Sequence, residues 1–143
     1  MKKSIVCQNE AQIGQILGID FGKSKVGLAI ADQETRMAFA YDVLSNDKAF
    51  WLNLKEIVAS ENVKLIVVGM TKHQNDQESE KTKQTFVKEL RKKLTVEIAL
   101  QEEMFTTKMA QANLKAKGMK NVAKHDDAEA ARIILQAWLD RNL

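Results

Sequence analysis

Residues 16–32 read ILGIDFGKSKVGLAIAD, and the fold follows from this stretch. Two apolar runs, residues 16–20 and 25–31, flank a short turn built from Gly, Lys and Ser. Gly22 can adopt a backbone conformation that other residues resist, so the second run is predicted to fold back antiparallel to the first. Asp20 then lies where the first strand ends, and a metal ion or a phosphate can approach it there. The alternative interpretation is an aspartate that only starts a hairpin turn.

Bulk composition indicates one soluble globular domain. The chain has 143 residues, of which 45% are hydrophobic and 29% charged, with a formal net charge of +3. The single cysteine, Cys7, excludes an internal disulfide, and no Cys/His cluster suggests zinc. No apolar run is long enough to cross a membrane or to act as a signal peptide, so we expect a cytoplasmic protein. Residues 1–14 are interpreted as an N-terminal extension and residues 15–143 as the domain.

The remaining patterns alternate between strand and helix. The predicted elements are a strand over 36–44, a helix from about 50 to 60, a strand over 65–68, a basic helix over about 81–94, a strand over 95–100, a helix from 106 or 107 to 117, and a last helix over 126–140. Residues 45–47 offer caps for the first helix, and residues 71–80 are predicted to form an exposed loop. Three antiparallel strands followed by helix-linked strands predict an α/β fold. It is a mixed five-stranded sheet with helices on both faces, the ribonuclease H-like arrangement.

The last predicted helix carries an acid on its apolar side. At about 100° per residue, Asp127 falls in line with Ala131, Ile134 and Trp138, opposite a predicted solvated face. That solvated face contains Glu129, Arg132, Gln136 and Asp140. A carboxylate on a core-facing stripe is costly unless the free N–H groups of a helix N-terminus or a cation compensate it. The alternative is that Asp126 and Asp127 only cap this helix.

A second acidic pair, Glu102 and Glu103, follows the fifth predicted strand. Because neighbouring strand ends meet at one edge of such a sheet, Asp20 and Glu103 are expected to converge, and Asp127 to join them from the packed helix. Clustered carboxylates repel unless a divalent cation lies between them, and oxygen ligands favour Mg²⁺ or Mn²⁺. Such ions can activate water against a phosphodiester bond. The alternative is a pair of surface acids in a loop.

Lysines surround these acids in the sequence. Between Met104 and His125 there are five lysines and no acid, and two more lysines lie in the first turn. The candidate nucleic-acid contacts are Lys23, Lys25, Lys108, Lys115, Lys117, Lys120 and Lys124. Such side chains suit a polyanionic substrate, because they hold the phosphate backbone without reading base sequence. The alternative for each one is an ordinary solvated cation.

In combination, four motifs resemble the YqgF/RuvX family of Holliday-junction-resolvase-like proteins, which are described as pre-16S rRNA nucleases. The motifs are residues 17–29, 65–70, 102–107 and 127–136. The resemblance implies a ribonuclease H-like fold and a cytoplasmic nuclease with Asp20, Glu103 and Asp127 as catalytic, metal-binding acids. Asp126, where the family usually has an apolar residue, is a further candidate metal ligand.

Several functions follow from this resemblance as expectations. The first is a Mg²⁺- or Mn²⁺-dependent endonuclease that processes the 5′ end of pre-16S rRNA, as a monomer or a weak homodimer. A resolvase of branched DNA is the second, and it would need a dimer. A non-cleaving ribosome assembly factor stays open, because Met104 replaces a usual arginine of the family. Sugar kinases and related ATPases share the Asp-x-Gly turn, but they need a second copy of the fold.

Overall fold

A computed structural model describes residues 14–70, 77–102 and 122–142, with only the backbone for residues 77–79 and 122–126. Its centre is a five-stranded sheet in the order β3-β2-β1-β4-β5. The strands are β1 (Gln15–Phe21), β2 (Lys25–Asp32), β3 (Ala38–Ser45), β4 (Val63–Met70) and β5 (Glu97–Glu102). In the described residues, three helices pack on it: α2 (Phe50–Ser60), α3 (Gln77–Lys93) and α5 (Val122–Asn142).

The sheet is mixed, as the sequence predicts. β1 pairs antiparallel with β2, and β2 pairs antiparallel with β3. β4 pairs parallel with β1, and β5 pairs parallel with β4. The four central residues of β4, 65–68, are apolar and buried, which is typical of a parallel strand covered on both faces.

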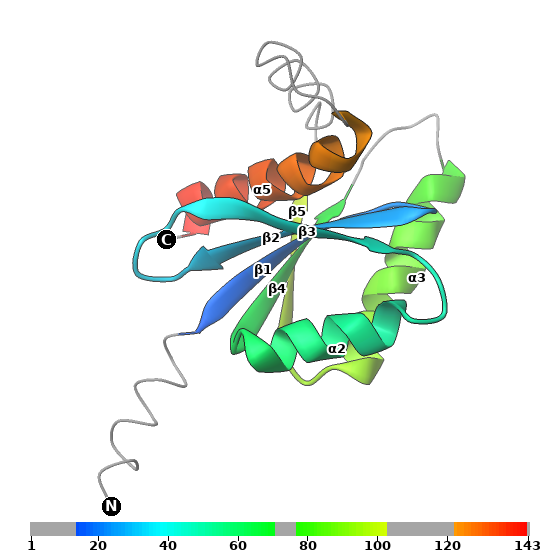
Figure 1. Cartoon of the computed structure of the whole chain (residues 1–143), viewed down its shortest axis with the longest axis horizontal. Helices are drawn as coiled ribbons and strands as arrows, with labels where there is room; N and C mark the ends of the chain where they lie inside the picture. The colour runs from blue at the N-terminus through cyan, green and yellow to red at the C-terminus, as the bar shows by residue number, and fades with distance from the viewer. Residues whose placement is uncertain (1–13, 71–76, 103–121, 143) are drawn as a thin grey trace, which may run out of the picture.

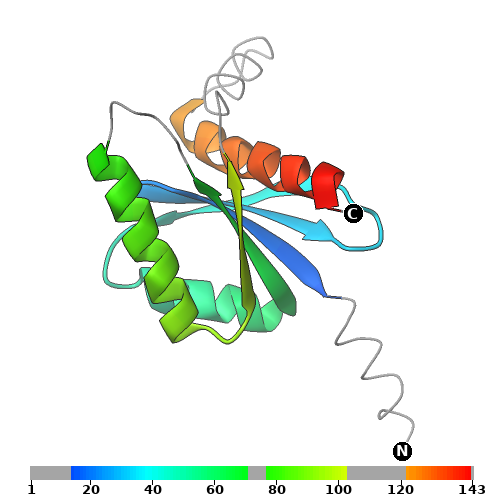
Figure 2. The ribbon, with the colours of Figure 1, turned by 180° about the vertical axis from the view of Figure 1, so that it is seen from behind.

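Helices α2 and α3 cover one face of the sheet, and α5 covers the other (Figures 1 and 2). Side-chain alternation along the strands divides the core in the same way. The core under α2 and α3 includes Leu17, Ile19, Leu28, Phe50, Leu54, Ile66, Val68, Phe86 and Leu90. The core under α5 includes Ile16, Ala29, Leu65, Val67, Ala131, Ile134 and Leu135.

Three local predictions were wrong. The polar loop expected over 71–80 ends earlier, because α3 already begins at Gln77. The N-cap of α2 is Ala49, which has no side-chain cap bond, while Asp47 accepts a hydrogen bond from the Ala49 N–H at 3.0 Å. The last helix begins at Val122, four residues before its predicted start. The helix predicted to end at residue 117 lies outside the described residues.

The face of α5 that was predicted to be solvated is only partly exposed to solvent. Asp140 is exposed, but Glu129, Arg132 and Gln136 are half-buried. Glu129 pairs with the guanidinium of Arg132, and Gln136 makes hydrogen bonds to the chain around the start of β3. This face therefore packs against the edge of the sheet. Within the described part of the chain, no helix is long and apolar enough to span a membrane.

Candidate carboxylate site at the end of β1

Asp20 is half-buried near the carboxyl end of β1 and faces α5. It follows Ile16 and Gly18 in the strand alternation, and both of these residues contact the α5 side of the molecule. Its partner on β2 is Gly27, and directly paired residues present their side chains to the same face of a sheet. The carboxylate therefore belongs to the layer between sheet and helix.

Gly27 brings Asp127 to this position. A Cβ atom added at Gly27 would overlap the backbone carbonyl of Asp127, so the α5 backbone lies directly on β2 at this point. Asp20 is the cross-strand neighbour of the same glycine. Asp20 and Asp127, 107 positions apart in the sequence, thus both border Gly27. The α5 backbone at Asp127 therefore lies on the strand pair that carries Asp20.

A second close approach fixes the direction of α5. A Cβ atom added at Gly18 would lie 2.7 Å from Cβ of Leu135 and 3.1 Å from the carbonyl oxygen of Ala131. Positions 127, 131 and 135 are each one helical turn apart. The two glycines therefore place three successive turns of α5 along β1 and β2, with Asp127 at the end nearest Asp20.

Gln101 lies in the same row of the sheet, and sequence analysis missed it. Gln101 on β5 pairs with Gly69 on β4. On the other side of β4, Ile19 pairs with Val68, so the next residue of β1, Asp20, lies level with Gly69. Gln101 is 6% exposed, and its amide donates to the carbonyl of Glu102 at 3.3 Å. The sequence signal that could have identified Gln101 is its position on β5. It is a polar residue on the buried face, and the next residue, Glu102, is exposed on the opposite face.

The other predicted acids have a mixed outcome. Glu103 lies outside the described residues, and of Asp126 only the helical backbone is described. The capping interpretation of Asp126 and Asp127 was wrong, because α5 begins at Val122 and both residues lie within the helix. Helix-terminal N–H groups are therefore not the reason for an acid at Asp127.

The basic turn between β1 and β2 is exposed beside this site. Lys23 and Lys25 both face solvent. The turn is held from the other side by Asn46, whose side-chain amide donates to the Gly22 carbonyl at 2.8 Å. The Asn46 backbone N–H also donates to the Ser24 carbonyl at 2.8 Å. Lys108, Lys115, Lys117 and Lys120 lie outside the described residues, and Lys124 is described only as helical backbone.

The donor set suits a hard divalent cation. Carboxylate oxygens are the ligands that such ions prefer, and Asp20 and Asp127 both border Gly27. No group of three or more His, Cys, Asp and Glu side chains that could hold a metal occurs among the residues described.

Solved structures support the fold. *Thermus thermophilus* RuvC in complex with a Holliday junction substrate matches with a TM-score of 0.57 at 15% identity, over 90% of this chain and 94% of that one. Fowlpox virus resolvase with Holliday junction DNA matches with a TM-score of 0.57 at 11% identity. The match covers 90% of this chain and 99% of the fowlpox chain. The yeast mitochondrial resolvase Ydc2 gives a TM-score of 0.52 at 11% identity. The match covers 96% of this chain and 84% of the yeast chain. The fold is therefore ribonuclease H-like, of the class found in junction resolvases.

Sequence comparison gives the family. A family model described as "RuvX: Holliday junction resolvase" matches residues 14–141, and the chain belongs to this family of nucleases. Two relatives carry the name "putative pre-16S rRNA nuclease". The one from *Maridesulfovibrio salexigens* is 34% identical over 89% of this chain and 98% of its own length. The one from *Malacoplasma penetrans* is 33% identical over 87% and 93%. The resemblance identified from the four motifs is confirmed.

Proposed function

We propose that this protein is a divalent-metal-dependent endonuclease of the cytoplasm that hydrolyses phosphodiester bonds of structured RNA, with the 5′ end of pre-16S rRNA as its target. The observation that carries the proposal is the convergence of Asp20 and Asp127 on Gly27. The names of the relatives supply the substrate, because carboxylates and lysines alone do not distinguish RNA from DNA.

Each group has a role in this proposal. Asp20 and Asp127, with Glu103 as the expected third acid, would hold Mg²⁺ or Mn²⁺, which supplies an activated water and neutralises charge at the scissile phosphate. Lys23 and Lys25 bind the flanking phosphates by charge. Gln101 lies in the same row, and its amide holds the Glu102 carbonyl, directly before the expected third acid in the sequence.

The test is cleavage of labelled pre-16S rRNA fragments with Mg²⁺ or Mn²⁺ by the wild type, Asp20→Asn and Asp127→Asn. We expect both substitutions to reduce cleavage by at least about a hundredfold, because each removes a charged ligand. Asp140→Asn is the matched control, since Asp140 is exposed at the far end of α5. Cleavage that survives in both site variants would contradict the proposed roles.

A second candidate function is resolution of four-way DNA junctions, which the description of the family model favours. The same four proteins, incubated with a four-way DNA junction, distinguish the two substrates. Symmetric nicking of the junction without cleavage of RNA would replace the first proposal. Binding of RNA without cleavage of either substrate would indicate an assembly factor.

A further inference from the structure

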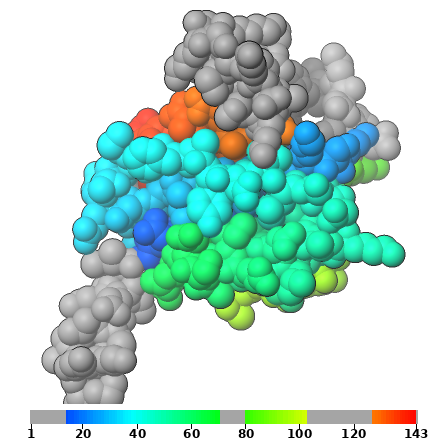
Figure 3. Space-filling view, in the orientation of Figure 1, coloured from blue at the N-terminus to red at the C-terminus, as the bar shows by residue number. Residues whose placement is uncertain are grey.

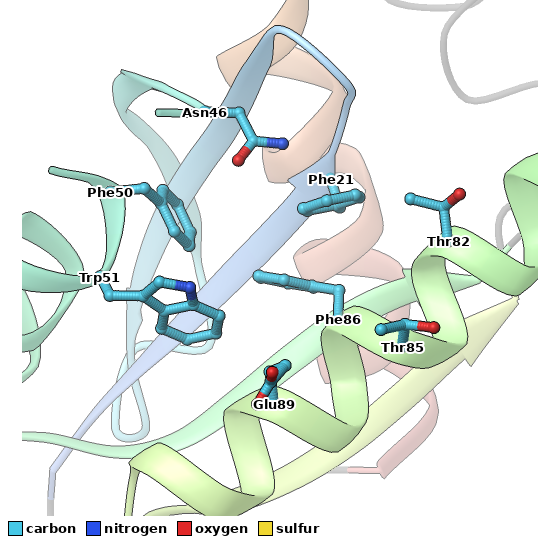
Figure 4. A pocket seen from close by; sticks show the side chains of 8 residues that line it. All are labelled: Phe21, Asn46, Phe50, Trp51, Thr82, Thr85, Phe86 and Glu89. Atoms are coloured by element: carbon cyan, nitrogen blue, oxygen red, sulfur yellow. The ribbon is translucent and has the colours of Figure 1, made fainter. Parts of the chain in front are cut away.

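A pocket of about 300 Å³ opens on the α2 and α3 side of the sheet, away from Asp127. It lies between the two helices at the end of β1 (Figure 4). The residues that line it are Phe21, Asn46, Phe50, Trp51, Thr82, Thr85, Phe86 and Glu89. The carboxylate site does not use any of these side chains.

Four aromatic rings form the wall of this pocket. Phe21 and Phe86 stack with ring centroids 4.2 Å apart, and Trp51 lies 5.6 Å from Phe86 at an interplanar angle of 33°. Phe50 and Phe86 are 1% and 4% exposed, so the core fixes them, while Phe21 and Trp51 are half-buried. A fixed wall with partly accessible rings suits a flat aromatic ligand, because little side-chain entropy is lost when it stacks.

Polar groups lie around the rings. Figure 4 shows Asn46 above the row of aromatic side chains and Glu89 below it. The hydrogen bond from Asn46 to the Gly22 carbonyl fixes the orientation of the amide, and the hydroxyl residues Thr82 and Thr85 line the α3 side. Amide, hydroxyl and carboxylate groups can pair with the donors and acceptors on the edge of a nucleobase.

Charges of both signs lie at the pocket: Glu89 lines it, Asp47 is exposed beside Asn46, and several lysines lie around it. The Nζ atom of Lys93 lies 5.4 Å from the centre of the Trp51 ring. Lys48, just before α2, and Lys55, on α2, are both exposed. Lys23 and Lys25 are exposed in the neighbouring turn between β1 and β2. These cations would not stabilise an uncharged apolar ligand. They would attract the phosphates on either side of a bound base.

The pocket and the carboxylate site lie at the same end of β1. Phe21 follows Asp20 directly, so the two side chains point to opposite faces of the sheet. The turn that carries Lys23 and Lys25 connects the faces, and Asn46 binds this turn from the pocket side. A single nucleic-acid strand that crosses the turn can therefore contact both sites.

We propose that the α2–α3 pocket binds an unpaired base of the substrate, stacked on Trp51, while a neighbouring phosphate lies at Asp20. This proposal rests on the proposed function, because it takes nucleic acid as the substrate. It adds that the strand must offer an unpaired nucleotide close to the cleaved bond. Loops and single-stranded flanks of structured RNA provide one, and a fully paired duplex does not.

The first experiment uses the fluorescence of Trp51. The chain has two tryptophans, so Trp138→Phe leaves Trp51 as the only one. With Asp20→Asn added and no divalent metal present, the protein is titrated with a single-stranded RNA oligonucleotide and with a perfectly paired RNA duplex. We expect the single strand to quench Trp51 and the duplex to leave it unchanged, because stacking requires an accessible base. Equal quenching by both probes, or by neither, overturns the proposal.

The second experiment measures affinity. Trp51→Leu should raise the Kd for single-stranded RNA by about tenfold, a typical loss for one stacked base, and leave the Kd for the duplex unchanged. Trp51→Phe keeps an aromatic face and should retain most of the affinity. Leu52→Ala is the matched control, since Leu52 is 63% exposed on α2 and does not line the pocket. Circular dichroism checks that each variant is folded.

The two proposals fail separately. The Trp138→Phe protein with Asp20 intact is assayed for cleavage with Mg²⁺ or Mn²⁺. Cleavage without Trp51 quenching overturns the base pocket and leaves the nuclease proposal standing. Quenching by single strands, without cleavage of RNA or junction DNA, overturns the nuclease proposal and supports base binding.

Discussion

Gly27 has no side chain, and the backbone of α5 at Asp127 fills the space that a methyl group there would occupy. In Gly27→Ala, the helix must move away from β2. We expect a loss of about 1–3 kcal/mol in the free energy of unfolding, as for other overpacked sites. Urea denaturation measures this loss, and RNA cleavage should fall as well, because Asp127 moves relative to Asp20.

The matched control for this substitution is Ser45→Ala, at an exposed position on the neighbouring strand β3. It should leave both stability and cleavage close to wild type. If Gly27→Ala behaves like Ser45→Ala, the close approach of helix and strand is not a requirement of the site.

Tyr41 gives a prediction about pH. Its hydroxyl donates to Glu61 Oε2 at 2.9 Å, and this hydrogen bond to a carboxylate, with smaller effects from burial and nearby acids, raises the pKa of Tyr41 above its usual value. The stability contributed by this bond is complete below the ordinary tyrosine pKa of about 10 and is lost as pH rises through the raised pKa. Tyr41 is the only tyrosine, so tyrosinate absorbance reports it alone.

In Glu61→Gln, the absorbance titration should shift back toward the ordinary value. A titration that is the same in both proteins would show that the hydrogen bond to Glu61 does not control the pKa of Tyr41.

At the scale of single residues, sequence analysis selected the candidate acids where chemistry and periodicity agreed. Asp20 was identified because an acid ends an apolar strand, and Asp127 because it falls on the apolar stripe of a helix. Gln101 was missed because its importance comes from the strand register, which sequence alone does not give. The role of Gly27 depends on where α5 crosses the sheet, so it also needed the tertiary structure.

At the scale of elements, the Gln136 side chain adds hydrogen bonds to the apolar packing between α5 and the edge strand β3. Gln136 accepts a hydrogen bond from the Ala38 N–H at 2.9 Å and donates to the Arg36 carbonyl at 3.0 Å. Arg36 has a φ of 57°, which side-chain-bearing residues rarely adopt. Gln136 therefore stabilises a turn whose backbone conformation is otherwise unfavourable.

Gln136→Leu should lower the free energy of unfolding by about 1–3 kcal/mol, because it leaves the part-buried Ala38 N–H without its partner. Hydrogen exchange at the Ala38 amide should become faster. Gln84→Leu, on the exposed side of α3, is the control and should change neither measurement. Unchanged exchange at Ala38 in Gln136→Leu would argue against this role.

The element boundaries predicted from sequence were good for strands and poorer for helix starts. The alternation and length of the apolar runs defined all five strands within about two residues at most ends. The start of α5 was misplaced because Asp126 and Asp127 imitate a helix cap. The start of α3 was misplaced because its first turn is polar throughout.

On the scale of the whole molecule, the groups proposed to bind substrate lie at one end of the sheet. β3 and α2 fill much of one face (Figure 3), while the carboxylate site, the basic turn and the base pocket gather at the end of the sheet where β1 finishes. Substrate binding should therefore depend on the charges at that end and not on the net charge of +3.

Salt dependence tests this arrangement. Replacing both Lys23 and Lys25 by Ala should weaken RNA binding similarly for all sequences and reduce the slope of log K against log salt by up to about 2. Lys64→Ala is the control, because Lys64 is exposed near the amino end of β4, at the opposite end of the sheet. If Lys64→Ala changes the salt slope equally per lysine, the contribution of a lysine to RNA binding does not depend on its position.

The contact between Gly27 and Asp127 joins β2 to α5 across 100 positions of the sequence, and it has a consequence for folding. A contact between such distant positions forms only after the chain between them has been brought together, and closing that long loop costs entropy. If Asp127 acts as proposed, a partly folded chain in which α5 has not docked is expected to bind nucleic acid without cleaving it.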